Sequence, residues 1–198
     1  QPPDLTVLVA GGPAFYADIE TVSQRDLRRA ELIAFPFALV TLVLVFGSVV
    51  GAMVPLLVGG LGVAAILLTI YLLAQVVDLS IFVLNLATML GLGLAIDYSL
   101  FVTSRFREEL ARHPGDIETA VVRSVALAGR AVFFSGMTVL TGLAGLALFD
   151  FLFLRSVGIA GAIVVAYSVL AALTLLPAVL GVIGPRIDSG RLFRRTTT

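Results

Sequence analysis

The feature that most constrains this chain is a run of 46 residues, Leu32 to Val77, without Asp, Glu, Lys, Arg or His. Crossing the hydrocarbon core of a bilayer takes a helix of about 20 apolar residues, so this run is long enough for two spans. Two more uncharged runs follow, at 131–149 and 156–185. With 59% hydrophobic and 13% charged residues, the chain exceeds the apolar content of a soluble domain. These runs predict a polytopic helical membrane protein.

The predicted fold class is an all-α membrane protein, a bundle of five transmembrane helices plus one interfacial helix. Strands are not expected in the membrane, because lipid admits only helices or closed barrels and the alternating pattern of a barrel strand is missing. Pro177 is expected to kink or end the fifth span. The spans are expected at 31–50, 53–75, 81–105, 131–149 and 156–183, and the interfacial helix at 117–128.

Three regions are expected along the chain. Residues 1–30 contain a strand pattern at 5–10 and an amphipathic helix pattern at 14–29. We interpret them as the remnant of a soluble α/β domain; a disordered flank is the alternative. Residues 31–185 form the transmembrane helical domain, and residues 186–198 form a basic tail. Because the chain begins at Gln1 without a methionine, we expect a piece of a longer protein.

The orientation in the membrane follows from the arginines, since cytoplasmic loops carry an excess of positive charge. Five predicted spans place nine arginines on one side and four on the other. The first group is 105, 107, 112, 123, 130, 186, 191, 194 and 195, and the second is 25, 28, 29 and 155. The 105–130 connection and the C-terminal tail are therefore predicted to be cytoplasmic, and the N-terminal region external.

One carboxylate, Asp97, is the only acidic residue in the interior of any predicted span. A charge at the bilayer centre costs from about 3 to more than 10 kcal/mol, so such residues are usually functional. Gly93 and Ala95 leave room for a neighbouring helix, and we expect Asp97 and Tyr98 to face a helix interface. A proton relay is the functional interpretation; a hydrogen-bonded packing residue is the alternative.

Hydroxyl groups on the fourth predicted span are further candidates. Ser135, Thr138 and Thr141 are spaced so that they can face Asp97. The alternative is that these hydroxyls bond back to the carbonyls of their own helix. The chain has no cysteine and one histidine, His113, in a Pro-Gly loop. We therefore predict no metal site, no cofactor other than protons, and no nucleic-acid partner.

The stretch Gly91–Phe101, read with Ser104–Leu110, resembles the fourth transmembrane helix of MmpL-type transporters of the resistance-nodulation-division (RND) superfamily. The resemblance extends to the Phe46-Gly47-Ser48 turn and to Arg130–Ser135. It covers nearly the whole chain, and it implies that the five spans are helices two to six of a twelve-helix transporter. Residues 1–30 are then the C-terminal remnant of the external porter domain.

The resemblance also implies roles for individual residues. In the family, an Asp-Tyr pair on helix four meets an equivalent pair on helix ten, and together they form the proton relay. Asp97 and Tyr98 match the first pair; the second pair belongs to a half that this chain lacks. Phe101 matches a position lining the inhibitor-accessible cavity, and Ser135 matches a serine close to the relay. Gly93 lies on the same helix face as Asp97 and is expected to line the same cavity.

The function implied is export of lipids or other hydrophobic molecules, driven by the proton-motive force. The chain is expected to be a secondary transporter and not an enzyme, multi-pass in the bacterial inner membrane, in a family that includes drug efflux by proton antiport. Expected partners are membrane lipids, the hydrophobic substrate, the second half of the transporter, and further copies of the protein in an oligomer. The alternatives are a sterol-sensing-type or structural helical bundle without proton coupling, and a SecDF-like protein-export factor.

Overall fold

The structure is a computed structural model in which residues 11–189 are described. Those residues form helices joined by short loops, without a strand. The strand pattern at 5–10 and most of the basic tail lie outside the described residues. Contacts divide the chain into residues 1–38 and residues 39–198, and each part is considered by itself. Five described helices are long and apolar enough to cross a membrane, as predicted.

The first helix, α1 (Gly12–Phe46), is continuous. Two helices, at 14–29 and 31–50, were expected instead. They join because Arg29, Ala30, Glu31 and Leu32 at the expected break are all good helix formers. The helix ends at Gly47, where φ is 62°, a conformation that glycine adopts without a steric penalty.

A turn of two residues leads into α2 (Val49–Leu73), which begins four residues before the expected start of the second span at Met53. The Ser48 side chain caps α2, because its Oγ accepts a hydrogen bond from the Gly51 N–H at 3.0 Å. The third helix, α3 (Val83–Arg112), continues seven residues beyond the expected end of the span at Arg105. The His113–Gly115 loop then leads to Asp116, whose side chain caps α4 by accepting a hydrogen bond from the Thr119 N–H.

The fourth helix, α4 (Ile117–Leu146), corrects the prediction of a separate interfacial helix at 117–128. The interfacial segment and the fourth span are one helix of 30 residues. At 1.5 Å per residue it is about 45 Å long, more than the hydrocarbon core of about 30 Å. Gly129 lies at the expected break, but a Cβ there would come within 2.9 Å of Leu173. Close packing therefore holds the helix together at this glycine.

The fifth span consists of α5 (Leu152–Leu170), a π-helical turn η1 (Ala171–Leu175) and α6 (Leu176–Ile183), and it ends in a 3-10 turn η2 (Gly184–Asp188). The interruption predicted at Pro177 is present as η1, directly before the proline. Because proline has no N–H, it cannot bond to the carbonyl four residues earlier, which favours a local change of helix type.

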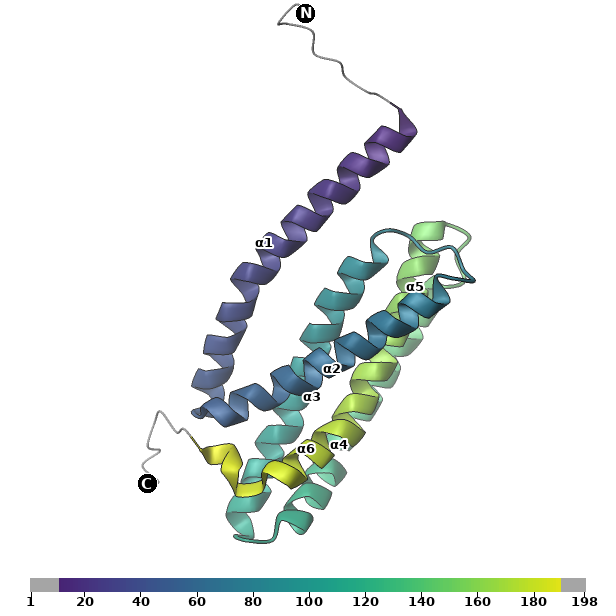
Figure 1. The fold of residues 1–198 in the computed structure, drawn as a ribbon. Helices are drawn as coiled ribbons and strands as arrows, with labels where there is room; N and C mark the ends of the chain where they lie inside the picture. The colour runs from purple at the N-terminus through teal and green to yellow at the C-terminus, as the bar shows by residue number, and fades with distance from the viewer. Residues whose placement is uncertain (1–10, 190–198) are drawn as a thin grey trace, which may run out of the picture. The chain divides into compact units, whose positions relative to one another are not determined.

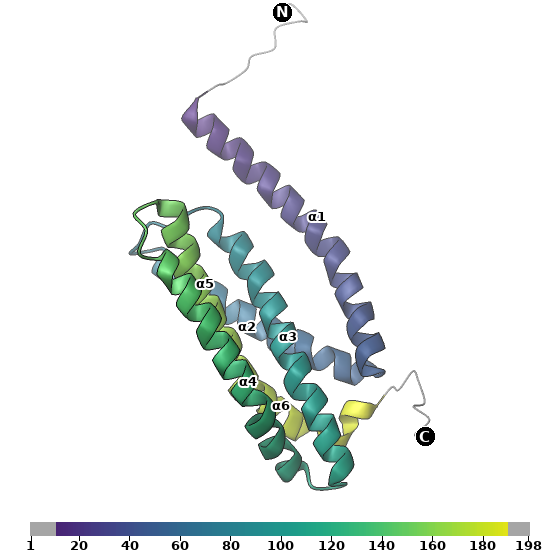
Figure 2. The same ribbon diagram turned by 180° about the vertical axis from the view of Figure 1, so that it is seen from behind.

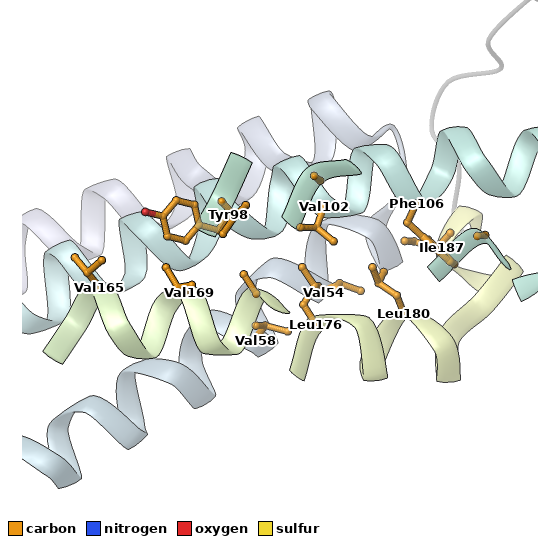
Figure 3. Close-up of a cluster of buried hydrophobic side chains, with 14 residues drawn as sticks. Val54, Val58, Tyr98, Val102, Phe106, Val165, Val169, Leu176, Leu180 and Ile187 are labelled. Carbon is orange, nitrogen blue, oxygen red and sulfur yellow. The ribbon is translucent and has the colours of Figure 1, made fainter. Parts of the chain in front are cut away.

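In residues 39–189, α3 is the central helix. It packs against α2, α4 and α5, which run alongside it in Figures 1 and 2. The largest buried cluster joins α3 to α2, α5, α6 and η2 (Figure 3). At the end of the bundle where the α2–α3 loop meets the start of α5, the Ser80 N–H donates to Ser156 Oγ at 3.0 Å. The Phe82 and Phe153 rings pack edge to face at the same end.

Candidate functional site

The candidate site lies in the middle of α3, where Asp97 and Tyr98 are neighbours in the sequence. Successive residues of a helix point about 100° apart, so the two side chains leave α3 in different directions. Tyr98 is buried, with 8% of its surface exposed, whereas Asp97 is exposed. Tyr98 therefore points into the core of the bundle, and Asp97 lies on one of its outer faces.

Tyr98 packs into the largest buried cluster, beside Val165 and Val169 of α5 (Figure 3). Its place depends on Gly136 of α4. A Cβ at Gly136 would come within 2.2 Å of a Val169 methyl group and 3.7 Å of the Tyr98 hydroxyl. Gly136 thus clears the space that the tyrosine ring and Val169 share. The sequence did not single out this glycine, although it directly follows Ser135.

Asp97 belongs to a stripe on the outer face of α3, with Gly93, Phe101 and Ser104. All four residues are exposed, and 47% of the Phe101 surface is accessible. A Cβ added at Gly93 would meet no atom within 4 Å. The expectation that Asp97 faces a helix interface is not met within residues 39–189, because no helix of that part covers the stripe.

The hydroxyl candidates of α4 separate into two groups. Thr138 and Thr141 donate to the carbonyls of Phe134 and Met137 at 2.9 and 2.8 Å, the back-bonding arrangement considered as the alternative. Ser135 is exposed and directly precedes Gly136, where an added Cβ would lie 3.7 Å from the Tyr98 hydroxyl. No hydrogen bond of ordinary geometry reaches that hydroxyl from the described residues. Asp97, Tyr98 and Ser135 thus form one neighbourhood.

The helices around this neighbourhood approach through small side chains. A Cβ on Gly59 of α2 would lie 3.4 Å from the Ala95 Cβ, and one on Gly91 would lie 3.2 Å from Ile66. The described residues include no group of three or more His, Cys, Asp or Glu side chains that could hold a metal ion. The chemistry available is therefore that of one carboxyl group, a phenol and hydroxyls, which exchange protons and donate hydrogen bonds.

Comparison with known proteins places this arrangement in a family. The model of the MMPL family matches residues 1–198. The membrane protein SCO6666 of Streptomyces coelicolor is 48% identical over 96% of this chain and 28% of its own length. The trehalose monomycolate exporter MmpL3 of Mycobacterium tuberculosis is 40% identical over 94% of this chain and 20% of its length. The mycolic acid-containing lipids exporter MmpL11 of Mycolicibacterium smegmatis is 38% identical over 89% of this chain and 18% of its length.

The match covers nearly all of this chain, but the chain spans under a third of each of these curated relatives. The relatives are therefore much longer proteins, of which this chain corresponds to one membrane segment. From the family match and its five membrane-spanning helices, the chain belongs to the MMPL family of multi-pass bacterial membrane proteins.

Proposed function

We propose that this chain is the proton-coupling membrane segment of an exporter of lipids or other hydrophobic molecules. The observation that carries the proposal is Asp97, a carboxyl group in the middle of α3, within its apolar segment before Arg105, and exposed on the outer face of that helix. A charge in the membrane is costly unless it has a partner or a function. An exposed carboxyl group at this depth is suited to accept and release protons.

In this proposal, the stripe of Gly93, Asp97, Phe101 and Ser104 faces the second half of the transporter. That half supplies a matching Asp-Tyr pair, as the resemblance implies. Tyr98 is fixed by the core, with its hydroxyl directed toward Gly136 of α4, next to Ser135 in the sequence. A change in the charge of Asp97 then alters the attraction between the halves, which lets the helices repack.

The substrate class and the location rest on the relatives. Two of them are named as exporters of trehalose monomycolate and of mycolic acid-containing lipids, which supports a lipid or similarly hydrophobic substrate. The arginine distribution supports an orientation with the α3–α4 loop in the cytoplasm of a bacterium and the protein in its inner membrane. Membrane lipids and the second half are the partners that this arrangement needs.

The test is Asp97→Asn in the full-length transporter, reconstituted into liposomes, with proton uptake followed by a pH-sensitive dye. The replacement has nearly the same shape but cannot release a proton, so uptake is expected to fall to the background of empty liposomes. Because asparagine has nearly the same size and carries no charge, its burial costs less than that of a carboxylate, and the variant is expected to stay folded, which thermal unfolding checks.

Asp150→Asn is the matched control, since Asp150 is exposed in the loop after α4 and outside the spans. It should transport protons at the wild-type rate. If the Asp97 variant also did so, Asp97 would be a packing residue and the chain a structural helical bundle, which is the competing interpretation.

A further inference from the structure

A second polar cluster lies at the predicted cytoplasmic end of α3, about 15 Å along the helix from Asp97. Its centre is Arg107, of whose side chain 19% is exposed. The guanidinium donates to the Phe46 carbonyl, to Ser48 Oγ at 3.0 Å and to the Asp188 carboxylate at 2.6 Å. It also lies over the Phe46 ring, 5.4 Å from the ring centre. We call this group the Arg107 clamp.

The clamp gathers the ends of three helical segments. Phe46 is the last residue of α1, Ser48 caps the start of α2, and Asp188 is the last residue of η2. The Ser48 hydroxyl also donates to the Ile187 carbonyl at 2.7 Å, across 139 residues of sequence. Carbonyls at the ends of helices carry partial negative charge, and the fork of an arginine can bind several acceptors at once. Arg107 therefore binds two helix C-termini and a carboxylate together.

On the other side of this end of α3, charged side chains surround Glu109. Glu109 is buried, with 2% of its side chain exposed, and it pairs with Arg112. Its other carboxylate oxygen lies 3.9 Å from Arg123 of α4 and 3.8 Å from His113. Charged contacts thus lie on both sides of this end of α3, although the one that reaches α4 is longer than a hydrogen bond.

Near Asp97, the contacts of α3 with the other helices differ in kind from those at its predicted cytoplasmic end. There, α3 meets its neighbours through small and apolar contacts, such as Gly59 with Ala95 and Gly136 beside Tyr98. Between Val83 and Ser104, no side chain of α3 is hydrogen-bonded to another helix of the described residues. Apolar contacts of this kind can slide, whereas the bonds of Arg107 depend on direction.

Buried ion pairs often add little net stability, because desolvation offsets their attraction. An arginine that fixes three chain segments is therefore better explained by the geometry that it imposes. We propose that the Arg107 clamp is the pivot of α3 in the transport cycle, and that Arg107 is a positioning residue for Asp97. This inference rests on the proposed function. A tilt of about 10° about the clamp moves Asp97 by about 2–3 Å while the cytoplasmic ends stay together.

The first experiment measures proton uptake by the full-length transporter in liposomes as a function of pH. Arg107→Gln and Asp188→Asn are expected to lower the maximal rate roughly tenfold, while the proton concentration for half-maximal rate changes less than about twofold. Asp188→Asn leaves Arg107 its other acceptors and guards against a variant that fails to fold. Arg105→Gln is the control, because 43% of the Arg105 side chain is exposed and, among residues 11–189, its ion pair is with Glu108 of its own helix. Folded clamp variants that match this control would overturn the proposal.

The second experiment reads the position of α3 directly. Cysteines at Gly59 and Ala95 fit a disulfide, since their Cβ atoms would be 3.4 Å apart, near the distance of about 3.8 Å in natural disulfides. Their oxidation rate is expected to differ between wild type and Asp97→Asn, and this difference should shrink at least about threefold when Arg107→Gln is added. An unchanged difference would show that α3 moves without the clamp.

The relay at Asp97 and the pivot at Arg107 can be refuted independently of each other. Proton uptake by Asp97→Asn tests the relay, and it does so with the clamp intact. If Asp97→Asn abolishes proton uptake but Arg107→Gln and Asp188→Asn do not change it, the proposed function stands and the pivot is refuted.

Discussion

The Tyr98 ring is buried while its hydroxyl oxygen has no hydrogen-bond partner among the described residues. Tyr98→Phe removes this buried polar group, so stability should stay constant or rise by up to about 1 kcal/mol. Proton uptake should slow, yet less than in Asp97→Asn, because the carboxyl group of the proposed relay remains. Thermal unfolding and uptake by the full transporter check both parts. A loss of stability would indicate that this hydroxyl has a partner in the missing half.

Gly136 offers a sharper test of packing at the site. Gly136→Ala places a Cβ within 2.2 Å of the Val169 side chain, and overpacking of this kind costs about 1–3 kcal/mol. Gly142→Ala on the same helix is the control, because a Cβ there meets nothing within 4 Å. The comparison uses thermal unfolding of the two variants. Equal midpoints would mean that α4 and α5 lie farther apart than the structure shows.

At this scale the sequence identified candidate residues, Asp97 and Tyr98, but not the contacts around them. Asp97 was recognisable because a lone charge contrasts with its apolar surroundings, and Tyr98 because it is adjacent. Gly136 and Arg107 were not, since their importance depends on residues distant in the sequence, Val169 for one and Asp188 for the other. No local pattern records which segments of a chain will meet.

Among the elements, α4 carries a cap that responds to pH. Hydrogen bonds from the side chain and backbone of Thr119 hold the pKa of Asp116 below its ordinary value of 3.8. The folded state therefore favours the charged carboxylate, and its contribution to stability is present above about pH 3.8. That contribution is lost as the pH falls through the lower pKa of the folded protein.

Asp116→Asn separates capping from titration, because asparagine is also a good N-cap residue and does not ionise. The stability advantage of the wild type over this variant should be constant above the unfolded-state pKa of 3.8 and shrink as the pH falls from about 4 to about 2. Thermal unfolding of the full transporter across that range measures it. A difference that is constant with pH would exclude a charged cap.

The elements also show where apolar patterns are reliable. Four spans were predicted from uncharged runs of about helix length, the third span was predicted despite Asp97 within it, and Pro177 marked the π turn. The ends were less accurate. Charged residues at 105–112 and 117–130 ended the predicted spans, but they continue α3 and α4, because a helix extends into water as readily as it crosses lipid. Charge therefore marks the membrane boundary and not the end of the helix.

For the whole molecule, the predicted orientation can be tested with single cysteines in a full-length transporter freed of other cysteines; this chain has none. A cysteine replacing Thr119, at the start of α4, should resist a membrane-impermeant thiol reagent in intact cells, because the excess of arginine predicts a cytoplasmic location. A cysteine replacing Asp78, in the loop after α2, should react. The reverse pattern would invert the topology.

A carboxyl group that residues 39–189 leave uncovered also affects how the protein is made. During synthesis, α3 enters the bilayer before any later helix exists to cover Asp97. Insertion scales put an aspartate at the helix centre at about +2.5 to +3.5 kcal/mol. The ten Leu, Ile, Val and Phe residues between Val83 and Val102 contribute about −0.3 to −0.6 kcal/mol each. The leucine-rich sequence around Asp97 is thus what allows the nascent helix to insert with its acidic residue and await a partner.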